Sequence, residues 1–295
     1  MQQDKPSLTA LTIARVISDM GKHRRYKHLL TPKQAEINRV FAKSLLKDSP
    51  RLKLISPVLK GAALRGFLDK FIIPGVSLHY ALRKKFIREE FFKRDKQIEQ
   101  FVVIGAGFDS FCLEFHRNYP EIKFFEIDHP ATSSSKQKYI QRSRLQVAKN
   151  LVFIMSDLEK TSVKEALEAA GFVRDKRTFF VCEGVMMYLT KDGIQKLVNE
   201  VADIAATGSC FAVTMMDSFK SEKMNRHELV TDKVLNAQKE AFKTALSQHQ
   251  MEEIFSSAGF KIMEVGKYHE LQREHNRKAH NLKFARTESV YLFGK

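Results

Sequence analysis

The sequence contains few of the residues that would place it in a simple structural class. Its 295 residues include 13 Gly, 7 Pro, 3 Cys and no Trp. With so little Gly and Pro and with 43% hydrophobic residues, the chain is not collagen-like, low-complexity or disordered, and it can form a substantial core. No apolar run approaches the roughly 18 residues of a membrane-spanning helix, so no span is expected.

Cysteine is too scarce and too scattered to form a framework. Cys112, Cys182 and Cys210 show neither metal-ligand spacing nor the even number of a disulfide scaffold. The first residues lack the basic and apolar regions of a secretory signal. These absences predict a reduced, cytoplasmic setting and no metal site.

Acidic residues are scarce in one part of the chain. The whole sequence carries a net charge of +16, and residues 1–100 hold 22 Lys and Arg against 9 Asp and Glu. The next hundred residues are nearly balanced, with 14 against 13. A basic segment of this kind can bind nucleic acid, anionic lipid or an acidic partner, and it can equally be a solvated helical surface without a partner.

The basic third is expected to be helical. Apolar stripes at helical spacing predict helices over 7–20, 32–46 and 77–93, and Pro74-Gly75 predicts a turn before the last of them. We therefore assign residues 1–95 as a basic helical cap.

The pattern changes at Phe101, where short apolar runs begin to alternate with helical segments. Strands are predicted over 101–104, 123–128, 151–154, 178–182 and 210–215. Helices are predicted between them, over 110–118, 133–148, 163–170 and 192–205. This order is typical of an α/β protein with a mostly parallel, doubly wound sheet.

The end of the chain departs from this alternation. A long polar helical region is expected over 221–255, and two strand-like runs close the chain at 261–265 and 289–293. Because no long helix separates these runs, they suggest an antiparallel edge. We divide a single domain, 1–295, into four parts: a cap (1–95), a cofactor-binding core (96–217), a helical substrate-region insertion (218–258) and closing strands (259–295).

Glycines and acidic residues follow the predicted strands. Gly105-Ala106-Gly107 follows the first strand, and Asp128 stands 21 residues beyond Gly107 at the end of the second. Asp157 and Glu183 follow the third and fourth strands. Glycines let a ligand approach the backbone, and an acid about 20 residues later can accept hydrogen bonds from ribose hydroxyls.

The glycine turn lacks one feature of a dinucleotide site. The third glycine of that fingerprint is replaced by Ser110, which argues against a pyrophosphate packed on the following helix. Alone, Asp128 would more often be a turn or cap residue. Together with the strand order, the pattern favours an adenosine ligand without phosphate at this turn.

Three ordered motifs carry a resemblance to a known family. They are Phe101-Val102-Val103-Ile104-Gly105-Ala106-Gly107-Phe108-Asp109, then Phe125-Glu126-Ile127-Asp128-His129-Pro130 followed by Lys136, then Glu183-Gly184-Val185-Met186-Met187-Tyr188-Leu189-Thr190. They resemble the leucine carboxyl methyltransferase family of S-adenosylmethionine-dependent O-methyltransferases, which includes bacterial members linked to polyketide tailoring. The likeness covers about 78–215, and residues 1–77 and 218–258 match only loosely.

The resemblance implies a class I methyltransferase fold, with a seven-stranded sheet, an antiparallel edge and an N-terminal helical cap. It also implies that Arg83 pairs with the methionine carboxylate of S-adenosylmethionine, Asp128 holds the ribose, and Asp157-Leu158 recognises adenine. Gly105 would lie under the methionine portion, and Glu183 would face the cofactor amino group or the mouth of the site. The implied cofactor-binding residues are thus Arg83, Gly105, Gly107, Asp128, Asp157, Leu158 and Glu183. The alternatives are a surface charge for Arg83 and a strand-end or helix-cap acid for Glu183.

One departure from the family concerns the glycine turn, where many bacterial members have a Thr-Arg pair and this chain has Ser110-Phe111.

We expect no His–acid pair beside the motifs, and we assign no catalytic base. A carboxylate acceptor would need none, whereas a phenol or alcohol would benefit from one. His129 is expected to be structural.

The expected substrate is a small molecule or acyl chain, whose anionic group a basic cap could steer. Two rivals stay open. One is a nucleic-acid methyltransferase that uses the basic cap, which the apolar helical placement of the cap's aromatic residues disfavours. The other is a non-catalytic scaffold, which the four retained polar groups Arg83, Asp128, Asp157 and Glu183 disfavour.

Overall fold

One seven-stranded sheet organises the protein. The computed structural model describes residues 8–24, 26–48, 76–158, 160–216, 242–275 and 288–295. Its strand order is β3-β2-β1-β4-β5-β7-β6. The strands are β1 (Gln100–Ile104), β2 (Lys123–Asp128), β3 (Leu151–Met155), β4 (Thr178–Cys182), β5 (Cys210–Met216), β6 (Lys261–Gly266) and β7 (Glu288–Gly294).

Strands β1 to β5 pair with one another in parallel, and β7 runs antiparallel to both of its neighbours, β5 and β6. The antiparallel edge follows from the chain order, since only α12 (Tyr268–His275) lies between β6 and β7 among the described residues. The predicted α/β, mostly parallel sheet is confirmed.

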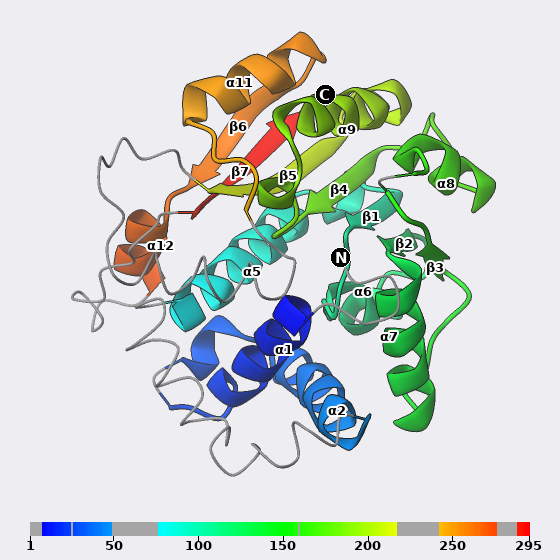
Figure 1. Ribbon diagram of the computed structural model, residues 1–295, viewed down its shortest axis with the longest axis vertical. Coiled ribbons are helices and arrows are strands. Elements are labelled where there is room, and N and C mark those ends of the chain that lie inside the picture. The colour runs from blue at the N-terminus through cyan, green and yellow to red at the C-terminus, as the bar shows by residue number, and fades with distance from the viewer. Residues whose placement is uncertain (1–7, 25, 49–75, 159, 217–241, 276–287) are drawn as a thin grey trace.

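Helices cover both faces of this sheet (Figure 1). Alternate residues of β1 divide between two cores: Phe101 and Val103 pack on one face, Val102 and Ile104 on the other. Such continuous apolar runs are expected of strands buried on both faces. The helices over the first face are α5 (Val76–Phe92), α6 (Phe111–Phe115) and α7 (Pro130–Arg142), and those over the second are α8 (Val163–Ala169), α9 (Lys191–Ile204) and α11 (Gln248–Ser257).

A small helical layer lies outside the first face, formed by α1 (Leu8–Met20), the short 3-10 turn η1 (Lys27–Leu29) and α2 (Pro32–Asp48). Figure 1 shows α1 and α2 in blue beside α5 in cyan. Helix α2 begins with a proline at its first position, where no amide donor is needed. The Thr31 hydroxyl accepts a hydrogen bond from the Gln34 amide at 2.9 Å and caps this end.

Helix α5 is not the solvated basic surface that is one interpretation of its sequence. Three of its four Lys and Arg residues, Arg83, Lys84 and Arg88, are buried, and Lys85 is partly exposed. Buried charges persist in proteins when they are paired, so this helix requires anionic partners inside the fold.

Helix boundaries differ from the predicted ones in several places. The helix predicted over 133–148 begins earlier, at Pro130, and ends at Arg142, shortly before Arg144 adopts a positive φ of 55°. The helix predicted over 110–118 is shorter and covers Phe111–Phe115.

The prediction over 221–255 is wrong for residues 242–247, which form no helix; residues 221–241 lie outside the described part of the chain. Helix α11 begins only after Ser247, whose side chain and that of Gln250 form a capping box.

All three cysteines are free and buried. Within the described ranges, no helix is both long enough and apolar enough to span a membrane. The same residues contain no group of His, Cys, Asp and Glu side chains arranged to hold a metal ion.

Candidate functional site

The glycine turn lies against the ends of β2 and β4. Gly105 and Gly107 have positive φ angles of 71° and 50°, which glycine adopts without strain. A Cβ atom on Gly105 would lie 2.4 Å from Cγ2 of Val185, so only glycine fits there. The amides of Gly105 and Ala106 both donate to the Ile127 carbonyl, at 2.9 and 3.0 Å. The turn is thereby fixed over the edge of the sheet.

Asp128 stands at the end of β2 and contacts the same turn. Its Oδ2 accepts a hydrogen bond from the Gly107 amide at 2.5 Å. Burial raises the pKa of Asp128, and hydrogen bonds from the Gly107 and His129 amides oppose that shift only in part. The carboxylate that the sequence assigns to ribose is therefore held next to the glycines.

Asp157 and Leu158 follow β3, the neighbour of β2. Asp157 is half-buried and pairs with Lys160 at 3.1 Å, and Leu158 packs against the second core. Because β3, β2, β1 and β4 are adjacent, the residues that follow them meet at one edge of the sheet. This edge holds Gly105, Asp128, Asp157 and Glu183, and ligands of parallel sheets bind at such carboxyl ends.

Arg83 reaches this edge from α5 and lies between two carboxylates. Its Nε donates to Oε1 of Glu183 at 2.7 Å, and its Nη1 donates to Oε2 of Glu288 at 2.7 Å. Burial alone would lower the pKa of Arg83, but Glu288 and Glu183 outweigh it and raise the pKa above its ordinary value. Burial likewise opposes ionisation of Glu288, yet Arg83 and His79 lower its pKa well below the usual range.

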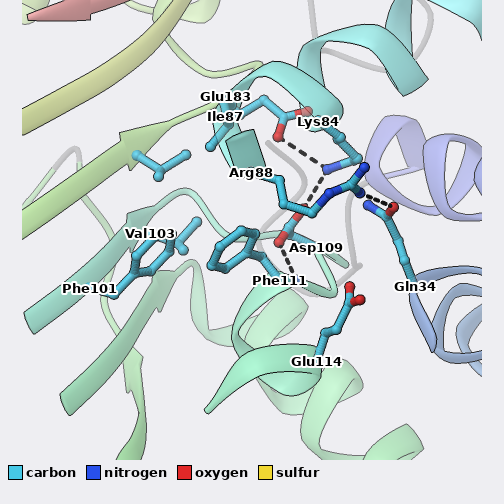
Figure 2. Close-up of a pocket in the computed structure, with 11 residues that line it drawn as sticks. Gln34, Lys84, Ile87, Arg88, Phe101, Val103, Asp109, Phe111, Glu114 and Glu183 are labelled. Carbon is cyan, nitrogen blue, oxygen red and sulfur yellow. Dashed lines mark hydrogen bonds and ion pairs between the residues drawn. The ribbon is translucent and has the colours of Figure 1, made fainter. Parts of the chain in front are cut away.

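Lys84, the next residue of α5, belongs to the same cluster (Figure 2). Its Nζ contacts Oε2 of Glu183 at 3.1 Å and forms an ion pair with Asp109 of the glycine turn. Asp109 in turn accepts from the Phe111 amide at 2.7 Å, at the start of α6. Sequence analysis assigned no role to Lys84 or Asp109, yet their ion pair connects α5 to the turn.

Glu183 therefore has both carboxylate oxygens occupied by cations of α5. The resemblance implied that Glu183 faces the cofactor amino group or the mouth of the site. In this structure its contacts tie α5 to the end of β4, and the implied contact with the cofactor stays a prediction.

A His–acid pair also lies beside the motifs, contrary to the sequence expectation. Nε2 of His79 and Oε2 of Glu288 are 2.6 Å apart, and both side chains are almost fully buried. The two residues are 209 positions apart in the chain, so no local motif contains them. The one available signal was Glu288 at the start of an apolar strand, where a buried acid requires a partner.

A second buried ion pair supports the motif that ends in Asp128. Lys136 of α7 contacts Oε2 of Glu126 at 2.5 Å, with side chains only 2% and 3% exposed. Burial raises the pKa of Glu126, and the Lys136 ammonium counteracts this only in part. This pair joins α7 to β2, two residues before Asp128.

The cavity in Figure 2 is lined by residues of α5, α2, α6 and the sheet, and it shares Lys84, Asp109 and Glu183 with the cluster around Arg83. It measures about 20 Å³, room for a water molecule and not for a nucleoside. Phe111 lines it and stacks on Phe101 at a centroid distance of 4.5 Å. Ser110 accepts from Asn38 at 2.9 Å. The Ser110-Phe111 departure is thus packed into the core without disturbing the glycines.

Comparisons with known proteins agree with the motifs. The model of the family described as leucine carboxyl methyltransferase matches residues 33–202. The "Putative S-adenosyl-L-methionine-dependent methyltransferase YktD" of Bacillus subtilis (strain 168) is 27% identical over 168 residues, which cover 56% of this chain and 55% of that protein. A protein of Mycobacterium ulcerans (strain Agy99) with the same description is 32% identical over 133 residues, 44% of this chain and 42% of its own.

The chain spans about half the length of the curated relatives it matches. Among solved structures, "a putative methyltransferase from Thermobifida fusca YX" is similar over 97% of this chain and 94% of that one, with a TM-score of 0.54 and 14% identity. This likeness supports the fold alone. Since the family model matches more than half of the sequence, the chain belongs to the leucine carboxyl methyltransferase family.

Proposed function

We propose that the protein is an S-adenosylmethionine-dependent methyltransferase that methylates an oxygen, either a carboxylate or a hydroxyl, of a small molecule or acyl chain. The observation that carries this proposal is the meeting of the glycine turn, Asp128 and Arg83 at one edge of the sheet. When bound there, the cofactor supplies an electrophilic methyl group on a sulfonium.

The residues at this edge fit the cofactor in both shape and charge. Gly105 and Gly107 leave the backbone open to close approach, and the buried Asp128 carboxylate can accept from ribose hydroxyls. Asp157 and Leu158 are assigned to adenine. Arg83 is assigned to the methionine carboxylate, and Glu183 holds Arg83 and Lys84 in place.

The described residues offer positioning more readily than acid–base chemistry. His79 is buried with its Nε2 on Glu288, so we assign it no proton transfer to substrate. Alignment and exclusion of water are then the main contributions of the chain. A carboxylate acceptor suits this site because it is already ionised at neutral pH.

The division of the chain into cap, core, substrate region and closing strands remains part of this proposal, with the cap and residues 218–258 contacting substrate. Exposed cations between α1 and α2, at Lys22, Arg24 and Lys27, could steer an anionic substrate.

The structure weakens the alternative that the protein is a nucleic-acid methyltransferase. Arg83, Lys84 and Arg88 contribute to the basic composition of the cap, yet they are buried inside the fold. Buried cations cannot neutralise backbone phosphates, which is the main source of nucleic-acid affinity.

Cofactor specificity can be measured by titration calorimetry. S-adenosylhomocysteine should bind saturably, whereas NAD should not, because the glycine turn lacks the third glycine. Asp128→Ala should weaken S-adenosylhomocysteine binding by about 1–3 kcal/mol, as expected for unmaking a buried hydrogen bond. Asp203→Ala, which changes an exposed acid on α9, is the matched control and should bind as wild type does. Saturable NAD binding without a response to S-adenosylhomocysteine would contradict the proposal.

The methyl acceptor can be found with isotope-labelled S-adenosylmethionine. Fractions of a cell lysate are incubated with the label and either wild type or Asp128→Ala, and the labelled product is treated with alkali. Release of label as methanol identifies a carboxyl ester. Alkali-stable label that is located on an oxygen of the purified small molecule identifies a hydroxyl acceptor. Label that appears only in RNA would instead support the nucleic-acid rival.

A further inference from the structure

The guanidinium of Arg83 has one nitrogen, Nη2, that its two carboxylate partners do not contact. Its Nε and Nη1 are bound by Glu183 and Glu288, but no described residue accepts a hydrogen bond from Nη2. Nη2 lies close to Gly184, where an added Cβ would be only 3.2 Å away. Gly184 follows Glu183 at the carboxyl end of β4, so this donor lies at the edge to which we assign the cofactor.

Contacts around the Arg83 guanidinium fix the direction in which Nη2 points. The two carboxylates hold adjacent nitrogens of one planar group, and the guanidinium carbon lies 4.8 Å from the Tyr80 ring centroid. An arginine side chain otherwise has several rotatable bonds, and ordering it during binding would weaken affinity. The contacts with Glu183 and Glu288 order the Arg83 side chain before any ligand binds.

Two carboxylates on one guanidinium would ordinarily leave little attraction for a third. Here each of them has a second contact: Glu183 with Lys84, which also pairs with Asp109, and Glu288 with His79. The negative charge around Arg83 is thereby shared. Arg83 is thus buried and rigid with Nη2 still available, so that a ligand carboxylate would be held by a directed, charge-assisted hydrogen bond and not by a net positive charge.

We propose that Glu288, supported by His79, is a positioning residue that directs Nη2 of Arg83 toward the carboxylate of the cofactor's methionine portion. The proposal rests on the function proposed above and extends it to the antiparallel strand β7, which lies outside the three sequence motifs. Glu288 touches no ligand in this scheme and acts only through Arg83.

The test compares two ligands that differ by one group. S-adenosylhomocysteine carries the carboxylate, and its decarboxylated analogue keeps the adenosine, sulfur and amino group. Glu288→Gln preserves the shape of the side chain but removes its charge. It should lower the affinity for S-adenosylhomocysteine by about tenfold, the scale of a weakened charge-assisted hydrogen bond. Affinity for the decarboxylated analogue should stay within about twofold of wild type.

Glu90→Gln is the matched control. Glu90 lies on α5, is as buried as Glu288, and also pairs with two cations, Lys93 and Arg94, but it does not contact Arg83. This variant should change neither affinity. The ratio of the two affinities is the decisive readout, because a general loss of stability would lower both together.

Equal losses for both ligands, or no loss for either, would overturn the positioning role. Should Glu288→Gln fail to fold, His79→Asn removes the supporting nitrogen and leaves the Arg83–Glu288 pair. It should then show the same carboxylate-selective loss in smaller degree, and an unselective change would refute the proposal. If wild type binds neither ligand, the proposed function itself fails, which is a distinct outcome.

Discussion

Arg83→Ala should lower the free energy of unfolding by about 3–5 kcal/mol, because removing one partner of a buried ion pair leaves uncompensated charge. The variant leaves two buried carboxylates, Glu183 and Glu288, without their shared cation. Binding of S-adenosylhomocysteine should fall together with stability. A surface charge, the alternative that the sequence left open for Arg83, could be removed with little loss of stability; the burial of Arg83 in this cluster predicts a larger loss.

Urea unfolding of wild type, Arg83→Ala and Lys85→Ala measures this effect. Lys85 is the matched control, since it lies on the same helix and its ion pair among the described residues is with the partly exposed Glu89 at i+4. Such surface pairs contribute less than about 1 kcal/mol. Equal midpoints for the two variants would show that the Arg83 cluster contributes no more than a surface pair.

Lys136→Met should destabilise the protein by a similar amount, about 3–5 kcal/mol at neutral pH. The substitution keeps the size of the side chain and removes the cation that faces Glu126 inside the fold. Glu126 would then have to take up a proton or remain buried as an unpaired anion. Replacing both partners, as Glu126→Leu with Lys136→Met, should recover more than half of the loss, because apolar pairs of similar volume replace buried ion pairs well.

The pH dependence of this loss has a definite sign. Burial raises the pKa of Glu126 in the folded protein above its ordinary value, and removing Lys136 raises it further. A raised carboxyl pKa lowers stability at pH values above the unfolded pKa of about 4.3 and has no effect below it. The difference in the free energy of unfolding between wild type and Lys136→Met should therefore become smaller as the pH falls from 7 toward 4. Unfolding is measured at several pH values across this range. A difference that stays constant or grows as the pH falls would contradict the assignment of Lys136 as the partner that stabilises the Glu126 carboxylate.

Several parts of the fold could be predicted from local patterns. Strand β4 begins and ends at the predicted residues, Thr178 and Cys182, because its five residues form one uninterrupted buried run. Helix ends were less predictable, as at α7, where Pro130 fits the first turn and His129 caps it. Caps depend on contacts of one or two side chains, which hydrophobic periodicity does not encode.

The sequence by itself determined the elements of the ligand-binding edge. Gly105, Asp128 and Asp157 follow consecutive strands of a parallel sheet, and the ends of such strands must meet at one edge whatever the remaining contacts are. Spacing along the chain was sufficient here, because each residue is placed by the strand that precedes it.

Only the tertiary structure decided how the charges of α5 are paired. Arg83 and Glu288 are 205 positions apart, and Lys84 and Glu183 are 99 apart. A basic helix with this composition could equally have faced solvent. Its burial follows from the packing of α5 against the first face of the sheet, where Leu78, Leu82 and Phe91 join the core. Once those side chains are buried, the adjacent cations are desolvated with them, and they are stable there only because β4, β7 and the glycine turn supply carboxylates within reach.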